Sequence, residues 1–509
     1  MARTMTPVDA RDILALMVHE MTGQEAGTIN INSSNFTSVG ESLFQYGKEN
    51  VLNSLTTVLF RTYFDIRPFT SKYKAIRAES HDLFRRRLRK ISYYAKDGKY
   101  SGNFNTDKFT NFATGFTNGE NPDGNGDPQS TKSQWEQDPP VPLEMHFGGL
   151  SVYQDVITKY LDKIEEAFEN EETFIDFVDG YVTEKFNDME SMKEGFSRLC
   201  VLNAIGMTYD MAPNMPGSNR NMTSAFNAEF GTSYTSKQLL TTYRSQFLAF
   251  LVSEIKKDSD AMENRSLNYH LSPPKQVDGV DYVLLRHTPK SAQKLLILSK
   301  FMIESEAYVL PAIFNPQYLD INNYEKIDFW QSENDKAAVD VTPAVYDIAT
   351  GYQVQGARVE IPYLIGMMFD DRAIVTDFRL QNARTTNVEA RKGYYNTWYN
   401  VARQNINDPT HKIILYYLAD ADLTASYTLT KVTSSNTAST LYTNDFYTTT
   451  LTPDSGYEIT TVTVTMGGTD ITTDVYDSDT GVITIPCVTG NIAITATATS
   501  SAKTTKKTE

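Results

Sequence analysis

Residues 121–132 have the spacing at which a calcium-binding loop places its ligands. The matching positions are Asn121, Asp123, Asn125 and Gly126. The last position of such a loop needs a bidentate Glu, but it is Lys132 here, and Pro122 interrupts the backbone. A chain of turns explains the same residues without an ion. The sequence therefore predicts no metal site in this segment.

Two further groups of carboxylates could do acid–base or metal chemistry. Asp370 and Asp371 are adjacent, and neighbouring strand residues point to opposite faces, so this pair does not converge on one substrate. We interpret Asp370-Asp371-Arg372 as a turn. The second group has no His or Cys among its members, Asp162, Glu165, Glu166, Glu169, Glu171 and Glu172. A solvated helix face explains it better than a divalent-metal surface.

The histidines and the short motifs of the sequence indicate no catalytic site. None of the 6 histidines stands at metal-ligand spacing from another His or from a Cys. The sequence has no phosphate-binding P-loop, no HExxH zinc pair and no GxSxG nucleophile turn. We expect no catalytic residue, no cofactor and no metal, and therefore a protein that is not an enzyme.

The whole-chain numbers narrow the class of protein. With 509 residues the chain is long enough for several domains, and its net charge of -16 argues against a body that binds nucleic acid by charge. Cys200 and Cys487 lie far apart, which favours two lone buried thiols over a disulfide. We find no secretion signal and no apolar run of the roughly 18 residues that span a membrane. We expect a protein that folds in the cytoplasm and has no membrane partner.

Apolar spacing predicts the elements that position these residues. Helices are expected over residues 7–22, from Glu41 to the Pro68 region, from Ser151, where Ser151 and Gln154 form a capping-box pattern, from about Glu172 to Ile205, and over 235–257 with a cap at Thr235 or Ser236. Residues 23–40 are expected to be an extended arm. Buried strands are expected in "QKLLILSKFMI" and "IPYLIGMMF", and further strands in "VPLEMHFGGL" and "KIILYYLAD".

Two neighbouring segments fit no compact core. The stretch "HDLFRRRLRKISYYAK" is strongly basic and suits a short helix or a strand. It could contact nucleic acid, but a solvated face, or one that pairs with an acidic neighbour, agrees better with the acidic chain. The stretch "FTNGENPDGNGDPQSTKSQWEQDPP" is almost free of apolar residues. Structureless loops of this length inside a compact domain are usually functional or disordered.

Composition changes sharply after Lys431. Lys and Arg are absent until Lys503, and Thr dominates in short alternating stretches such as "TVTVTM", separated by glycine turns. Regular short strands with turn signals predict a small β-sandwich over residues 427–500, followed by a flexible tail over 501–509.

The order of these segments resembles that of the major capsid proteins of tailed bacteriophages, which have the Hong Kong-type capsid fold. Four stretches carry the likeness: "PVPLEMHFGGLSVYQDVITKYLDKIEEAF", "IGMMFDDRAIV", "RKGYYNTWYNVARQNINDPTHKIILYY", and the Thr-rich stretch from "YTTTLTPDSG" to "NIAITATA". They look like the end of the extended loop with the spine helix, a late axial-domain strand and turn, the return through the peripheral domain, and an immunoglobulin-like module. The likeness is greatest to small podoviruses whose capsid protein carries such a C-terminal module.

This resemblance implies an α+β fold with a C-terminal all-β immunoglobulin-like sandwich. Its domains would be an N-terminal helix and arm (1–40), a peripheral-domain helix and strand (41–79), an extended loop (80–142), a spine helix with peripheral domain (143–205), an axial domain (206–390), a peripheral return (391–426), the immunoglobulin-like domain (427–500) and the tail (501–509). Because the sequence begins at the arm with no long helical leader, a separate scaffolding protein is expected.

The resemblance also implies the partners and the location. The chain would assemble with itself into pentamers and hexamers, with a scaffolding protein and a portal protein, around double-stranded DNA held by weak non-specific contact. It would reside in the virion after assembly in the bacterial cytoplasm, and its terminal module could touch host-surface or mucus glycans. The extended loop would lie across a neighbouring subunit through Arg85, Arg86, Arg87, Phe109, Phe112, Phe116 and Trp135.

Two other functions stay open on the sequence alone. One is a phage tail or surface adhesion protein that binds host carbohydrate through the sandwich, although the mixed middle region differs from the β-rich, repetitive build of fibres. The other is a glycan-acting enzyme with a β-module. Its many Asp and Glu residues permit this function, but no pair of carboxylates is singled out. The size of the particle that forms on expression separates the three.

Overall fold

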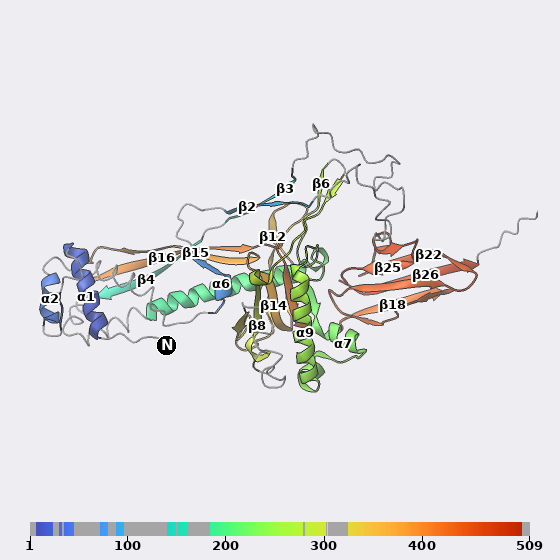
Figure 1. Cartoon of the computed structure of the whole chain (residues 1–509), viewed down its shortest axis with the longest axis horizontal. Helices are drawn as coiled ribbons and strands as arrows, with labels where there is room; N and C mark the ends of the chain where they lie inside the picture. Colours follow the sequence, from blue (N-terminus) through green and yellow to red (C-terminus); the bar gives the residue numbers. More distant parts are fainter. Residues whose placement is uncertain are drawn as a thin grey trace, which may run out of the picture.

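The computed structural model describes residues 7–23, 30–32, 35–44, 72–79, 88–95, 140–148, 151–160, 184–277, 280–301, 303, 324–389 and 391–500. The described elements follow one another along the long axis of the molecule (Figure 1). Two N-terminal helices and a long-stranded sheet lie at one end, a mixed α/β domain lies in the middle, and an all-β domain lies at the other end. We call these parts the wing, the central domain and the sandwich.

Two short helices open the wing. Helix α1 spans Pro7–Thr22 and α2 spans Phe36–Phe44. The predicted apolar face of the first helix is confirmed, since Ile13, Leu14 and Met17 are buried. The extended arm expected up to residue 40 is wrong at its end, because Phe36 already begins a helix. Asn32 and Asn35 exchange side-chain to backbone hydrogen bonds just before it. Val51, Leu52 and Leu55, expected on the second helix, lie outside the described residues.

The wing sheet has the strand order β1-β15-β16-β4. Its strands span Arg77–Glu79, Ile374–Thr385, Tyr394–Asn407 and Ser151–Tyr160. The helix that we expected from Ser151 is therefore wrong. β4 pairs antiparallel with β16 along its whole length, from Ser151 opposite Arg403 to Tyr160 opposite Tyr394. Instead of capping a helix, the Ser151 hydroxyl accepts a hydrogen bond from Arg403 Nε at 3.0 Å. Cross-strand pairing outweighs a short capping pattern here.

The long helix α6 runs beside this sheet and enters the central domain (Figure 1). It spans Glu184–Asp210, whereas we expected a helix from about Glu172 to Ile205. The helix is confirmed from Glu184 onwards and continues past the expected end. The acidic run between Asp162 and Glu172 lies outside the described residues.

The central domain is built on a five-stranded sheet of order β5-β17-β14-β8-β9. The strands span Asn219–Asn221, Ile413–Leu418, Tyr363–Asp370, Gln293–Leu298 and Tyr324–Ile327. The strands expected in "QKLLILSKFMI", "IPYLIGMMF" and "KIILYYLAD" are confirmed as β8, β14 and β17, which are almost wholly buried. The first run is a strand only as far as Leu298, because residues 299–301 are helical. The turn at Asp370-Asp371-Arg372 is also confirmed, with Asp370 as the last residue of β14. Two small antiparallel pairs of strands belong to the same part of the chain: β10 (Val339–Val341) with β13 (Val359–Ile361), and between them β11 (Ala344–Tyr346) with β12 (Gln353–Gln355).

Three helices cover the central sheet. They are α7 (Met222–Phe230), α8 (Ser236–Thr241) and α9 (Arg244–Glu263). A cap was predicted at Thr235 or Ser236, and the structure has it at Thr235, which forms a capping box with Gln238. The single helix expected over 235–257 is in fact two, because Tyr243 leaves the helical conformation. Its ring stacks on Tyr234 at 4.0 Å between centroids.

A two-stranded ribbon rises from the central domain (Figure 1). β2 (Leu88–Tyr93) pairs antiparallel with β3 (Pro142–Phe147), so the strand expected in "VPLEMHFGGL" is confirmed. The described part of the basic segment is a strand and not a helix. A second ribbon lies beside it, formed by β6 (Lys275–Val277) and β7 (Val280–Tyr282), and Ala95 bridges to Val283. Residues 80–87 and 96–139 lie outside the described residues.

The sandwich has two sheets, of orders β20-β18-β26-β22-β23 and β19-β21-β25-β24. In chain order its elements are β18 (Leu423–Thr430), β19 (Val432–Ser434), β20 (Thr440–Leu441), β21 (Tyr447–Pro453), β22 (Tyr457–Met466), β23 (Thr469–Asp470), α12 (Thr472–Val475), β24 (Tyr476–Asp477), β25 (Val482–Ile485) and β26 (Ile492–Ser500). Side chains of both sheets, among them Val464, Ile494, Leu451 and Ile483, share one core. The first strand begins at Leu423, upstream of the expected boundary at residue 427.

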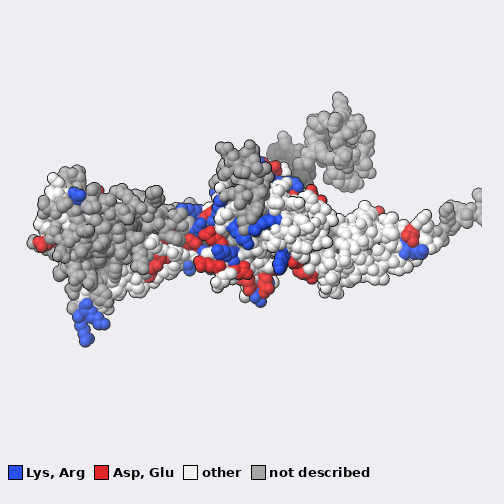
Figure 2. Space-filling model, turned by 90° about the horizontal axis from the view of Figure 1, so that it is seen from below, with Lys and Arg blue, Asp and Glu red and all other residues white. Residues whose placement is uncertain are grey.

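Cys200 and Cys487 are both free and buried, as predicted. Among the described residues, none of the helices is long and apolar enough to cross a membrane. Figure 2 shows that Lys, Arg, Asp and Glu gather over the central domain on one face, while the sandwich is nearly uncharged there.

Candidate interaction surface along the long helix

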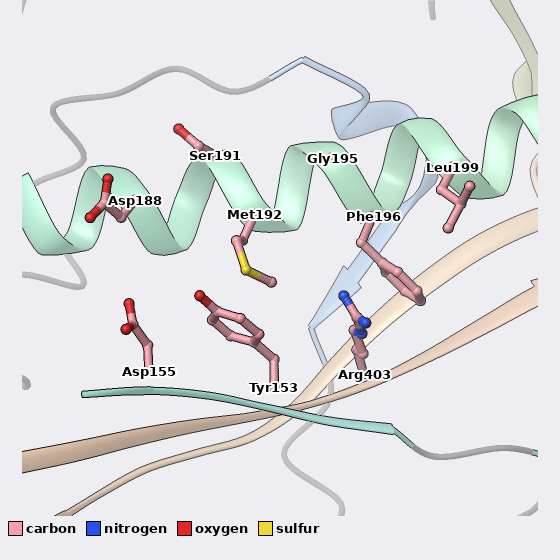
Figure 3. Close-up of a pocket in the computed structure, with 9 residues that line it drawn as sticks. All are labelled: Tyr153, Asp155, Asp188, Ser191, Met192, Gly195, Phe196, Leu199 and Arg403. Atoms are coloured by element: carbon pink, nitrogen blue, oxygen red, sulfur yellow. The ribbon is translucent and has the colours of Figure 1, made fainter. Parts of the chain in front are cut away.

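A groove runs between α6 and the wing sheet (Figure 3). Its volume is about 690 Å³, and it is lined by Tyr153, Asp155, Asp188, Ser191, Met192, Gly195, Phe196, Leu199 and Arg403. In Figure 3, Met192 and Phe196 point from the helix towards the sheet, and Tyr153 and Arg403 point from the strands towards the helix. The groove is therefore mainly apolar and aromatic, with charged groups at particular points along it.

Helical and strand periodicity together produce this lining. Asp188, Met192 and Phe196 recur every fourth residue of α6 and so share one face of the helix. Tyr153 and Asp155 alternate on β4, which places both on the same face of the sheet. Arg403 stands opposite Ser151 in the register of β16 with β4. The groove thus needs three chain segments that are distant in sequence.

A small core fixes the floor of the groove. Ile157, Met189, Phe378, Tyr399 and Val401 are buried together beneath it, with Phe196 packed against them. The rings of Phe196 and Phe378 meet edge to face with 6.0 Å between centroids. The lining side chains that rest on this core are therefore held in defined positions.

Charge is unevenly distributed along the groove. The Arg403 guanidinium lies over the Phe196 ring at 4.3 Å, which is cation–π geometry. Asp155 and Asp188 supply carboxylates towards the other end, and Asp155 Oδ1 accepts the Val156 N–H at 2.8 Å. An occupant of this groove would meet an apolar middle, a cation at one end and anions at the other.

Several large apolar side chains near the groove and on the ribbon face solvent. Leu199, at the rim of the groove, is 62% exposed. On the wing sheet Val152 is 55% and Trp398 39% exposed, and on the ribbon Ile91 is 47% and Tyr93 59% exposed. Single exposed apolar residues are normal on a soluble protein, and here several of them lie on the wing and on the ribbon.

A buried cluster of polar groups anchors the ribbon to the central domain. Lys90 of β2 reaches inward and forms an ion pair with Asp408, and its Nζ also donates to Thr410 Oγ1 at 2.8 Å. Arg286 donates to Ser92 Oγ at 2.7 Å and to the Thr410 carbonyl at 3.0 Å. Because these bonds join residues far apart in sequence, they set the direction in which the ribbon leaves the domain.

His411 belongs to the same cluster. Its Nδ1 lies 3.4 Å from Asp370 and its Nε2 lies 3.7 Å from Asp408. Burial, together with the Lys90 ammonium ion, lowers the pKa of His411 to about 4, so the ring is neutral at pH 7. Burial alone would raise the pKa of Asp408, but the Lys90 charge and the hydrogen bonds from Lys90 and Thr410 act against it, and this pKa lies below its usual value.

Lys412, next in sequence, is held by a different set of partners. Its Nζ donates to the carbonyls of Met262 and Asn264 at 3.1 and 2.7 Å and to Ser266 Oγ at 3.1 Å. Burial lowers its pKa to about 8. Among the described residues, no group of three or more His, Cys, Asp or Glu is arranged to hold a metal ion. The polar clusters here join elements to one another.

The residues that we predicted to contact another subunit cannot be placed. Arg85, Arg86, Arg87, Phe109, Phe112, Phe116 and Trp135 all lie outside the described residues. Of the basic segment, Arg89 is described and pairs with Glu144 at 2.6 Å on the exposed side of the ribbon. Sequence reasoning missed the groove and the function of Lys90. The spacing of Met192 and Phe196 on α6 was the only signal for the groove, and it indicates an apolar helix face without naming its partner.

Comparison with known proteins gives structural but no sequence matches. No family model matches the chain, and no curated protein sequence matches it. Among solved structures, it is similar to a chain in the capsid structure of Staphylococcus phage Andhra, with 12% identity and a TM-score of 0.41 over 67% of this chain and 83% of that chain.

Two further solved structures illustrate the range of the matches. A chain from a structure of head fiber and inner core protein gp22 of native bacteriophage P68 has 10% identity and a TM-score of 0.41, over 68% of this chain and 85% of that chain. A chain from the head structure of Helicobacter pylori bacteriophage KHP40 has 10% identity and a TM-score of 0.31, over 69% of this chain and 91% of that chain.

Proposed function

We propose that this chain is the major capsid protein of a tailed bacteriophage, which self-assembles into the icosahedral or prolate head shell around double-stranded DNA. The observation that supports this most is the arrangement of elements in one elongated subunit. A projecting ribbon, a long helix beside a long-stranded sheet, a central sheet domain and a terminal sandwich follow in the order expected of a Hong Kong-type capsid protein (Figure 1).

The groove and the exposed apolar side chains support the same function. A subunit of a closed shell must be covered by its neighbours, and the wing and the ribbon carry the side chains that such covering would bury. We propose that residues 80–142 of one subunit lie across the wing of the next. Their few aromatic residues would pack in an apolar groove, and Arg85, Arg86 and Arg87 would approach the end that carries Asp155 and Asp188.

The remaining parts of the particle follow from this function. Pentamers and hexamers would form the shell, with help from a separate scaffolding protein, and a portal protein would occupy one vertex. The net charge of -16 fits a shell that holds its DNA through weak, non-specific contacts. The sandwich would be an immunoglobulin-like module on the outer surface, where its Thr-rich strands, which contain no Lys or Arg, could touch host or mucus glycans many times over.

An adhesion protein of the tail or the surface is the alternative, and α6 with the mixed central domain argues against it. Fibres are β-rich and repetitive, whereas here a long helix and a five-stranded mixed sheet form the body. Analytical ultracentrifugation of the full chain expressed with candidate scaffolding proteins separates the two functions. Closed shells sediment as one very large species, while an adhesion protein remains a small oligomer.

A further inference from the structure

In the described part of the chain, a loop of the sandwich contacts the central domain. This docking loop, residues 442–446, leads into β21, and residues on α6, α7 and β17 contact it. Asn227 Nδ2 donates to Tyr442 Oη at 3.1 Å, Tyr417 Oη donates to the Thr443 carbonyl at 3.4 Å, and Ser224 Oγ donates to the Asp445 carboxylate. Asn444 Nδ2 donates to the Tyr209 carbonyl at 3.5 Å. These contacts join the two domains by side chains as well as by the chain connection.

The docking loop is also fixed from the side of the sandwich. Asn444 N donates to the Val488 carbonyl at 2.8 Å, and Val488 N donates to the Asp445 carbonyl at 2.9 Å. Asn444 adopts a φ of 66°, in the left-handed region that Asn tolerates better than most residues. Asp422, in the connection between the domains, accepts both the N–H and the hydroxyl of Thr443, at 3.0 and 2.6 Å. The loop is therefore held by hydrogen bonds from both domains.

We propose that the docking loop is a pH-dependent latch that holds the sandwich in one orientation on the central domain. This latch is stronger when Asp445 carries a proton. A carboxylate at a contact between two domains loses water when the domains dock, so its neutral form suits the docked state better. Release of the loop returns the side chain to water. The latch thus couples the orientation of the sandwich to acidity.

The surroundings of Asp445 support this direction. Burial raises its pKa from 3.8 to about 6, against the opposing effects of the Ser224 hydrogen bond and the Arg220 charge, and the Asp422 carboxylate raises it further. The other titratable groups that face it are Tyr209, Tyr417 and Cys487. Burial raises the pKa of each of these three, so they stay neutral across the range in which Asp445 titrates.

The sign and size of the effect follow from proton linkage. The pKa of Asp445 is higher in the docked state than in the released state, so the docked state binds the proton more tightly. Docking therefore strengthens as the pH falls through about 6 and gains nothing more below about 3.8. A shift of this size changes the docking equilibrium by about tenfold between pH 8 and pH 5.

Cys487 provides a native probe of the latch. Its thiol donates to Asn444 Oδ1 at 3.5 Å, and it lies close enough to Tyr209 and Tyr417 to influence their pKa values. Cys200 on α6 is also buried, and burial raises the pKa of both thiols to about 12. When both cysteines of the full-length chain are alkylated together, the ratio of their rates cancels the pH dependence of the thiol chemistry itself.

The experiment measures this ratio by mass spectrometry at pH 5 and pH 8. We expect the rate of Cys487 relative to Cys200 to rise about tenfold from pH 5 to pH 8. In Asp445→Asn, Cys487 should be alkylated slowly at both pH values, because the Asn side chain is always neutral. In Ser224→Ala, Cys487 should be alkylated faster than in the wild type at both pH values. Asp479→Asn, the same change at an exposed position of the sandwich, should behave as the wild type does.

Two results overturn the proposal. One is a ratio of the Cys487 and Cys200 alkylation rates that is the same at pH 5 and pH 8 in the wild-type chain. This result can be obtained without any variant. The other is an Asp445→Asn chain that retains the wild-type pH dependence, since the titrating group would then be a different one.

Discussion

Lys90 and Arg89 are adjacent in β2, but their environments are opposite. The Lys90 side chain is buried against Asp408 with 18% of it exposed, whereas 59% of the Arg89 side chain is exposed beside Glu144. Removing one partner of a buried ion pair leaves an uncompensated charge, while an exposed pair contributes little because water screens it. The sequence alone presents both residues as members of one basic run.

We predict that Lys90→Met destabilises the chain by about 3–5 kcal/mol and that Arg89→Met leaves its stability nearly unchanged. Denaturant unfolding of both variants, followed by tryptophan fluorescence, measures the difference. Equal effects of the two substitutions would show that Lys90 does not anchor the ribbon.

His411 gives the chain a defined response to acid. Its pKa of about 4 in the folded state lies below the ordinary 6.5, so between these values the unfolded chain binds a proton that the folded chain does not. Stability should therefore fall by about 1–3 kcal/mol as the pH drops from about 6.5 to about 4. Unfolding at a series of pH values measures this slope. His411→Gln should reduce it, and His287→Gln, at an exposed position, should leave it unchanged.

Leu199 tests whether another chain covers the groove. It is 62% exposed in the described structure, so Leu199→Glu should change the stability of the subunit by no more than about 0.5 kcal/mol. If a neighbour packs there, the new charge loses water on assembly, and the yield of particles should fall at least about tenfold. Leu267→Glu, at a 40% exposed position of the central domain outside the groove, is the matched control. Normal assembly of the Leu199→Glu chain would exclude the groove as a contact surface.

At the scale of elements, strands buried on both faces were the most predictable. β8, β14 and β17 are continuous apolar runs, and such runs identify a buried strand without any periodicity. A helix was predicted in place of β4 because Ser151 and Gln154 match a capping box locally. β4 pairs with β16, and Ser151 and Arg403 are 252 residues apart in the chain, so a single sequence does not reveal this pairing. The groove could not be predicted for the same reason, since its two sides come from segments that only tertiary contacts bring together.

The long polar segment gives a prediction at this scale. Deletion of residues 118–133 should leave the subunit folded, because this stretch is almost free of apolar residues that a core could bury. Assembly should be impaired, because we propose that this segment lies across a neighbour. Circular dichroism and electron microscopy of the deleted chain measure the two outcomes separately. Shells that form normally and are equally stable would show that the segment is not needed for contact.

At the scale of the whole molecule, the two large cores are separate. The described core of the central domain ends at Leu418, and that of the sandwich begins at Ala425. The sharp change in composition after Lys431 therefore indicated a real structural division, although β18 begins before it. The docking loop could not be predicted, because its partners Ser224 and Asn227 lie in a helix of the central domain.

We predict that a chain ending at Asp422 still folds and still assembles. It loses the contacts of the docking loop with Tyr417 and Asn227, which should lower its stability by about 1–3 kcal/mol. Thermal unfolding and negative-stain imaging of the truncated chain beside the full chain measure both effects. A truncated chain that fails to fold or to form particles, while the full chain succeeds, would make the sandwich part of the shell itself.

The central claim is that many copies of this chain build a closed shell in which each wing is covered by a neighbour. Cryo-electron microscopy of particles from the full chain and its scaffolding protein tests it most directly. We predict closed shells of pentamers and hexamers, with residues 80–142 of one subunit lying over Leu199 and Phe196 of the next. A chain that stays monomeric under every condition, or shells in which this groove faces solvent, would contradict the account.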